Sequence, residues 1–101
     1  MQKEFQYMVD FRLPTILSED FLKLIPFQRN KINKLFREGK LINYALSLDH
    51  SKMWAVVAAG SESEVKDVLF ELPLTRFMDF DINMLTFYNA VNADSPAFSL
   101  N

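Results

Sequence analysis

The stretch from Met53 to Ala59 is apolar on both of its faces, and this limits the possible folds of the chain more than any other feature. Side chains alternate between the two faces of a strand, so a strand that is apolar throughout belongs in the middle of a sheet. The polar stretch from Asp49 to Lys52 precedes it and has the length of a hairpin connection. We therefore expect a sheet in which this strand is central and follows a hairpin.

Three further stretches have the pattern of strands. The first alternates apolar and polar residues from Phe5 to Leu13, and the proline that follows ends it because proline cannot donate to a strand ladder. The second runs from Leu41 to Leu48. The last runs from about Phe77 to Tyr88 and places four apolar side chains on one face, namely Met78, Phe80, Ile82 and Met84.

Apolar residues at helical spacing predict a long helix between the first two strands. Ser18 supplies a capping hydroxyl, and Glu19 and Asp20 place negative charge in the first turn, where it is favourable. Gly39 ends the helix because glycine adopts the left-handed conformation at low cost. Pro26 lies inside the pattern and predicts a kink or a restart. The apolar stripe comprises Phe21, Leu24, Ile25, Ile32, Leu35 and Phe36.

A second, shorter helix is predicted after the central strand. Ser61 and Glu64 have the spacing of a capping box, and Leu72-Pro73-Leu74 ends the apolar stripe that follows them. The order of elements is therefore βαββαβ, the α+β ferredoxin-like arrangement with a four-stranded antiparallel sheet. Both helices cover one face of this sheet, and the other face is left bare.

The bare face predicts that the chain pairs with a copy of itself as a homodimer, since two-fold pairing is the commonest symmetry. Ten Phe, three Tyr and one Trp in 101 residues support this. A domain of this size buries only about 60–65% of its unfolded surface, so either self-association or a lined pocket is expected. We place one domain at residues 1–91. Residues 92–101 lack periodicity and form either a disordered tail or an arm that contacts a neighbouring subunit.

Composition excludes several functions. The absence of Cys excludes disulfides and thiol catalysis, and a single His argues against a metal site, so no cofactor is expected. A formal charge of −2 argues against nucleic-acid binding. The basic residues between Arg29 and Lys40 have the spacing of a solvated helix face. No apolar run reaches the roughly 18 residues that span a membrane, and a cytoplasmic location is expected.

Several polar or aromatic residues are candidates for a site. Gln28 interrupts the apolar stripe of the first helix, and a buried amide needs partners, so a pocket role competes with a structural one. Its neighbour Arg29 is a further candidate. His50 can act as a base near neutral pH, although a polar residue in a hairpin turn needs no function. The aromatic residues with polar tips either line the same space or pack in the core: Tyr7, Tyr44, Trp54 and Tyr88.

Asp79 and Asp81 lie two residues apart on a predicted strand and so share a face. Two neighbouring carboxylates can raise the pKa of one of them and create a base. They can equally pair with Lys or Arg from a neighbouring strand or subunit. Asp79 is interpreted first as structural, supporting the turn after residues 72–74.

The segment from Leu72 to Asp81, LPLTRFMDFD, resembles the Leu-Pro-Leu-x-x-aromatic-Met-Asp segment of muconolactone isomerases. Leu13-Pro14, Arg37-Glu38-Gly39 and His50 also fit that family, and the similarity covers roughly residues 5 to 90. The resemblance implies a dimeric α+β barrel, in some members assembled into larger rings. It also implies a small-molecule pocket near the first helix and the subunit interface.

The isomerase reaction of this family moves a proton at a carbon next to a lactone carbonyl, which requires a base and a group that stabilises the enolate-like charge. The resemblance assigns these roles to a Lys and a Glu on the first helix, and these positions fall on Ile25 and Gln28. A shift of one helical turn would bring Lys23 or Arg29 nearby instead. In the second strand, Asn43 and Leu46 stand where the family tends to carry His and Arg.

The interpretation is thus a small-molecule isomerase or proton-transfer enzyme with altered groups. The weak catalytic candidates are Gln28, Arg29 and His50, and the expected ligand-binding residues are Tyr7, Gln28, Asn43, Tyr44 and Trp54. A non-catalytic, homo-oligomeric ligand-binding module is the alternative. A cofactor-free oxygenase on the same scaffold is a third class.

Overall fold

The structure, a computed structural model, describes residues 4–89 of the chain. Its elements follow one another in the order β1 (Phe5–Arg12), α1 (Glu19–Arg37), β2 (Leu41–Leu46), β3 (Lys52–Ala59), α2 (Glu62–Glu71), η1 (Thr75–Phe77) and β4 (Asp79–Met84). The predicted βαββαβ order is therefore confirmed, with a single 3₁₀ turn, η1, added before the last strand. The segment predicted as a tail or arm, residues 92–101, lies outside the described residues.

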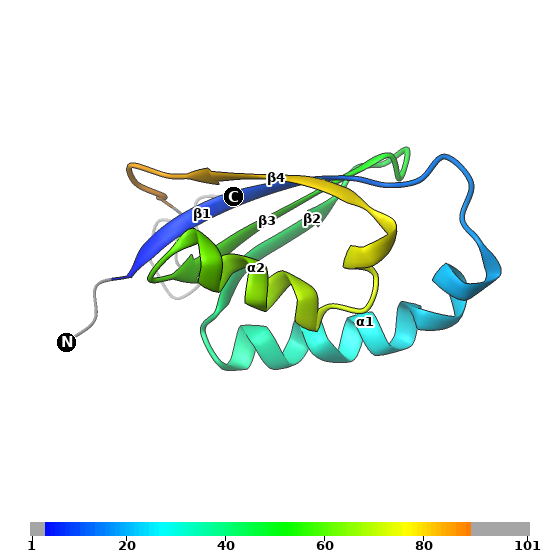
Figure 1. The fold of residues 1–101 in the computed structure, drawn as a ribbon, viewed down its shortest axis with the longest axis horizontal. Helices are drawn as coiled ribbons and strands as arrows, with labels where there is room; N and C mark the ends of the chain where they lie inside the picture. Colours follow the sequence, from blue (N-terminus) through cyan, green and yellow to red (C-terminus); the bar gives the residue numbers. More distant parts are fainter. Residues whose placement is uncertain (1–3, 90–101) are drawn as a thin grey trace, which may run out of the picture.

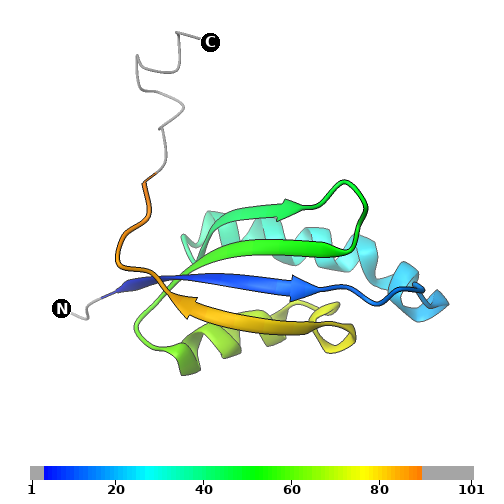
Figure 2. The same cartoon turned by 90° about the horizontal axis from the view of Figure 1, so that it is seen from above.

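The four strands form one antiparallel sheet in the order β2-β3-β1-β4. Both helices lie on the same face of this sheet, as Figure 1 shows. Seen from above, β3 and β1 occupy the middle and β2 and β4 the edges (Figure 2). Strand β1 pairs with β3 from Phe5↔Ala59 to Arg12↔Lys52, so the prediction that residues 53–59 are central is confirmed.

The core lies between the sheet and the two helices. Strand β1 contributes alternate residues, and Val9 and Phe11 are fully buried there. Residues paired across the strands share a face, so Ala55 and Val57 of β3 join them. The helices complete the core from the other side with Phe21, Ile32, Leu35, Val65, Val68 and Leu69. Burial of these side chains is the main stabilising contribution to the fold.

Helix α1 begins and ends as its sequence predicts. The Ser18 hydroxyl accepts a hydrogen bond from Phe21 N at 3.1 Å. At the other end Gly39 has a φ of 72°, and Lys40 N donates to Leu35 O at 3.0 Å. Of the two outcomes expected at Pro26, a kink or a restart, the restart does not occur, because one helix runs from Glu19 to Arg37. Proline removes one backbone hydrogen bond, and the packing of the buried face on both sides of it keeps the helix continuous.

Helix α2 also has the predicted cap. The Ser61 hydroxyl accepts from Glu64 N at 3.2 Å, while the Glu64 carboxylate accepts from Gly60 N at 2.7 Å. After α2, the Thr75 hydroxyl donates to Leu69 O at 2.6 Å and fixes η1. The predicted start of the last strand, near Phe77, is therefore too early, and its predicted end at Tyr88 is too late. The strand begins after η1, at Asp79, and it ends at Met84.

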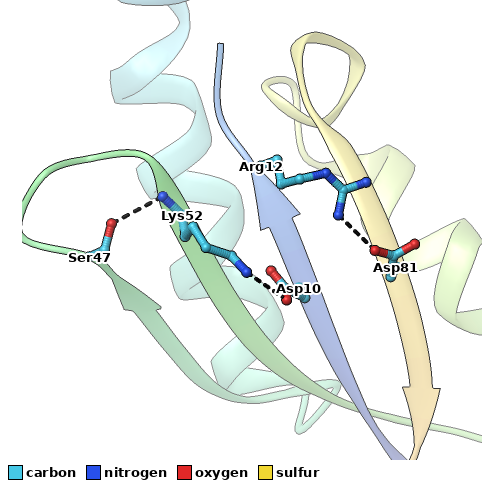
Figure 3. A network of polar contacts seen from close by, with 5 residues as sticks. All are labelled: Asp10, Arg12, Ser47, Lys52 and Asp81. Atoms are coloured by element: carbon cyan, nitrogen blue, oxygen red, sulfur yellow. Dashed lines mark hydrogen bonds and ion pairs between the residues drawn. The ribbon is translucent and has the colours of Figure 1, made fainter. Parts of the chain in front are cut away.

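The side of the sheet away from the helices, which we call the open face, carries charged and apolar residues, of which Val56 is fully buried: Met8, Asp10, Arg12, Lys52, Trp54, Val56 and Asp81. Lys52 Nζ lies 2.9 Å from Asp10 Oδ2, and Arg12 Nη1 lies 2.7 Å from Asp81 Oδ2 (Figure 3). The second carboxylate oxygen of Asp10, Oδ1, is buried and has no partner among the described residues. Both charge signs therefore lie beside apolar side chains on this face.

A β-bulge shifts the register of the edge strand β2. Leu41 is opposite Val57, but Asn43 is opposite Val56 and Tyr44 is opposite Ala55. Without the bulge, Leu41 and Asn43 would share a face; with it, Leu41 and Tyr44 do. Tyr44 consequently lies on the helix-covered side of the sheet, and Asn43 lies on the open face. No helix within residues 4–89 is both long and apolar enough to span a membrane.

Candidate small-molecule site

A cavity of about 440 Å³ lies between α1 and the sheet, at the end where the β2–β3 hairpin turns. Its walls come from the β1–α1 connection, α1, β2, the hairpin, β3 and the residues around η1. Most of the lining is aliphatic or aromatic, including Leu17, Phe21, Ile25, Ile32 and Met53. This volume and this lining are typical of sites for small organic molecules.

Gln28 is the buried polar residue of this cavity and is only 5% exposed. Its Oε1 atom accepts from Leu74 N at 3.0 Å, and its Nε2 atom donates to Tyr44 Oη at 3.2 Å. Both ends of the amide are thus engaged, which a buried amide requires. The first bond joins α1 to the segment before η1, and the second joins α1 to β2.

Tyr44 forms the other half of this polar pair. Its ring lines the cavity and its residue is partly buried. Burial raises the pKa of the Tyr44 hydroxyl above its ordinary value, and the hydrogen bond from Gln28 opposes this shift in part. The phenol is therefore neutral near pH 7 and keeps its proton.

His50 lies at the hairpin and also lines the cavity. Its φ of 62° places it in the left-handed region, where His is more frequent than bulky residues. The turn around it is organised by the neighbouring carboxylate. Asp49 Oδ1 accepts from Ser47 Oγ at 2.7 Å, from Ser51 Oγ at 2.7 Å and from Ser51 N at 3.0 Å. These bonds lower the pKa of Asp49 to about 2, the side-chain bond from Ser51 contributing most.

Few charged residues line the cavity. Arg29 lines it and is exposed, so its guanidinium keeps contact with solvent. The lining contains no Asp, Glu or Lys among the residues from 4 to 89. Lys23 is turned to solvent, 3.5 Å from Glu19 on the same helix face. Gln28, Tyr44, His50 and Arg29 are thus the groups that can carry polar chemistry here.

Three of the expected ligand-binding residues lie elsewhere. Tyr7 is 2% exposed and packs in the core. Asn43 is exposed on the open face, where its Nδ2 donates to Tyr88 Oη at 3.1 Å. Trp54 lies on the open face beside Lys52, whose Nζ is 5.7 Å from the ring centroid. The structure therefore brings Gln28, Arg29, Tyr44 and His50 to one cavity. Tyr7 stays in the core on the same side of the sheet, whereas Asn43 and Trp54 lie on the opposite side.

Asp79 and Asp81 share the open face and do not line the cavity. Asp81 forms an ion pair with Arg12, as the ion-pair alternative expects, and Arg12 is opposite Asp79 in the pairing of β1 with β4. Their side chains are largely solvated, which limits the energy of the contact. Within residues 4–89, no three His, Cys, Asp or Glu side chains lie close enough together to hold a metal ion.

The family model for muconolactone delta-isomerase matches residues 4–90 of the sequence. The chain belongs to the muconolactone delta-isomerase family. Its fold is also that of a solved muconolactone isomerase, with a TM-score of 0.67 over 88% of this chain and 97% of that one, at 22% sequence identity. No curated protein sequence matches the chain.

Membership of the muconolactone delta-isomerase family allows the residues of α1 that line the cavity to be compared with those of the isomerases. Ile25 and Gln28, which the resemblance aligns with the Lys and Glu of the isomerases, both line the cavity, as does Leu46 of β2. The cavity thus lies against α1, and apart from the exposed Arg29 its helix wall is apolar or neutral. The imidazole that lines the cavity, that of His50, comes instead from the hairpin.

Two features of the site were missed by sequence reasoning. Leu74 supplies the backbone N–H that holds Gln28, and this partner is 46 residues away in the sequence. Ser47, Asp49 and Ser51 form the turn that presents His50. The second feature had a local signal, since Asp and Ser around a turn often hydrogen-bond the backbone two residues on.

Proposed function

We propose that this protein binds a small organic molecule in the cavity between α1 and the sheet and moves a proton next to a carbonyl group. The observation that carries the proposal is that one apolar cavity is lined by buried Gln28, by partly buried Tyr44 hydrogen-bonded to it, and by a histidine. Apolar walls supply binding energy, and the few polar groups orient the ligand. Membership of an isomerase family supports the class of reaction.

His50 is the base of this proposal and Tyr44 is the donor. Neutral imidazole accepts the proton from carbon, and the C–H bonding electrons move toward the carbonyl oxygen. The Tyr44 hydroxyl donates a hydrogen bond to that oxygen as its negative charge develops. Imidazolium then returns the proton to a different carbon, so that the product is an isomer and His50 is neutral again.

Exchange of ligand protons with deuterium tests this directly. Lactones and ketones, muconolactone among them, are incubated with the protein in D₂O and followed by proton NMR. We expect protein-dependent loss of the signal next to the carbonyl, and a rate reduced by about 10²-fold or more in His50→Gln. Asp67→Asn, an exposed change on α2, is the matched control and keeps the full rate. Exchange that is equally fast in His50→Gln would remove His50 from this role.

A non-catalytic ligand-binding module is the second candidate function. It is favoured by the lack of any Asp, Glu or Lys in the described lining of the cavity. The same experiment separates the two functions. Saturable binding without deuterium incorporation at any position would establish the module and overturn the proton transfer.

We infer further that the chain forms a homodimer through the open face. That face places partly buried Met8 and Trp54 beside ion pairs of both signs, and a two-fold axis can set such a surface against itself. Light scattering at micromolar concentration should give at least twice the mass of 11.8 kDa. Trp54→Glu should give a folded monomer, and Lys66→Glu on α2 should leave the mass unchanged. A clean wild-type monomer would contradict the inference.

A further inference from the structure

The hydrogen bonds of Gln28 determine which way its amide is oriented. Leu74 N–H can donate only to an acceptor, so the amide oxygen must be the atom 3.0 Å from it. The amide nitrogen therefore lies 3.2 Å from Tyr44 Oη. A carboxamide nitrogen donates and does not accept, so Tyr44 Oη is the acceptor of this bond.

This orientation leaves the hydroxyl hydrogen of Tyr44 unused. The oxygen already accepts from Gln28, and its own O–H has no acceptor among residues 4–89. Burial favours the neutral phenol, so the group remains a donor through the physiological pH range. A ligand oxygen placed beside this partly buried hydroxyl can accept its hydrogen bond in largely apolar surroundings, where such a bond is stronger than in water.

The surroundings of Tyr44 also favour a ligand oxygen without charge. The amide of Gln28 and the phenol are both neutral, and apart from Arg29 and His50 the rest of the lining is apolar, including Phe21, Ile25, Ile32 and Met53. Arg29 is the permanent cation of the lining among residues 4–89, and it is exposed. A carboxylate at Tyr44 would lose its hydration without gaining a counter-charge, whereas a carbonyl needs only one donor.

We propose that Tyr44 determines specificity by donating a hydrogen bond to an uncharged carbonyl oxygen of the ligand, with Gln28 as the residue that positions it. The site thus selects ketones, esters and lactones that present C=O at the inner end of the cavity, over hydrocarbons of the same shape. This inference rests on the proposed function only in requiring that the cavity binds a ligand. It does not require that any proton is transferred.

A pair of isosteric probes tests it. Acetophenone and α-methylstyrene differ in a C=O against a C=CH₂ group and are otherwise closely matched in shape. Their Kd values are measured by titration calorimetry on the wild type and on Tyr44→Phe. We expect the preference for acetophenone, taken as the ratio of the two Kd values, to fall by about tenfold in Tyr44→Phe. The Kd of α-methylstyrene should stay unchanged, because the phenyl ring is retained.

Tyr88→Phe is the matched control, since it removes a tyrosine hydroxyl that lies on the open face, and it should leave the ratio as in the wild type. A second measurement needs no variant. The carbonyl carbon of ¹³C-labelled acetophenone should resonate further downfield in the bound state than in hydrocarbon solvent, as a hydrogen-bonded carbonyl does.

The outcomes separate the two proposals. If both probes bind with the same ratio in wild type and Tyr44→Phe, or if the bound carbonyl resonates as in hydrocarbon, the inference is wrong while the cavity remains a binding site. If neither probe binds, the proposed function is wrong and the inference fails with it. A lowered ratio together with the downfield shift supports the assignment of Tyr44.

Discussion

The amide oxygen of Gln28 accepts a hydrogen bond from the backbone N–H of Leu74 at 3.0 Å, across 46 residues of sequence. This contact joins the middle of α1 to the segment that leads into η1. It occupies the position where the family resemblance implies a catalytic carboxylate. Gln28, which stands in place of the acid, thus holds the fold together as well as lining the cavity. Its removal should therefore lower the stability of the fold and change the cavity.

Gln28→Ala should lower the free energy of unfolding by about 1–3 kcal/mol, because it leaves the buried Leu74 N–H without its acceptor. Urea denaturation followed by circular dichroism measures this. Asn33→Ala, on the exposed side of the same helix, is the control and should change stability by less than about 0.5 kcal/mol. Equal effects of the two substitutions would show that the contact with Leu74 contributes nothing.

Stability should fall at alkaline pH through Tyr44. Its folded-state pKa is raised above the ordinary 10.0 by burial, so the unfolded chain loses this proton first as pH rises. The contribution of the neutral phenol is complete below the unfolded pKa and is lost as pH rises through the folded pKa. Urea titrations at about pH 8 and about pH 10.5 should show a smaller loss in Tyr44→Phe than in the wild type. The same loss in both proteins would contradict this.

Asp49 should titrate at an unusually low pH. Hydrogen bonds from Ser51 and Ser47 lower its pKa from 3.8 to about 2, so the stability it contributes is present above pH 3.8 and is lost as pH falls toward about 2. Carboxyl carbon NMR measures the titration. Ser51→Ala removes the first of these bonds and should raise the pKa toward 3.8, while Ser63→Ala in α2 should not. An unchanged pKa in Ser51→Ala would mean that the turn is held in another way.

Gly39 should resist substitution for conformational reasons alone. Its φ is 72°, and a Cβ atom placed there meets no other atom within 4 Å. Gly39→Ala should therefore cost about 1–2 kcal/mol of unfolding free energy, the cost of a left-handed residue with a side chain. Gly39→Asn should cost less, because Asn tolerates this conformation. Thermal unfolding of the pair checks the order, and equal stability of Gly39→Ala and wild type would refute the argument.

The elements could be predicted because their signals are local. Capping by Ser18 and Ser61 and the positive φ of Gly39 follow from side chains within a few residues, and the structure contains all three. The start of the last strand was misplaced because the Thr75 hydroxyl bonds to Leu69 O and forms an extra turn. Nothing in the alternation of residues 77–84 distinguishes that turn from a strand.

The cavity was harder to predict because its lining depends on which residues of β2 face the helices. A strict period of two would place Asn43 with Leu41 on the helix-covered face, and the bulge places Tyr44 there instead. Trp54 is separated from Tyr44 for a related reason, since Tyr44 is opposite Ala55, the neighbour of Trp54. Adjacent residues in a strand face opposite sides, so Asn43 and Tyr44 do not line one pocket together.

The position of β1 in the sheet has a consequence for how the chain folds as it is made. This strand is synthesised first, yet its two partners are β3 and β4, whose residues end at Ala59 and Met84. On the ribosome, β1 therefore emerges long before either neighbour exists, and only α1 and the β2–β3 hairpin can form from local contacts. Strand β1 can pair with β3 once residue 59 has left the exit tunnel, but its other edge is covered by β4 only after residue 84 has followed, so both pairings of β1 are long-range contacts of the kind that slows folding.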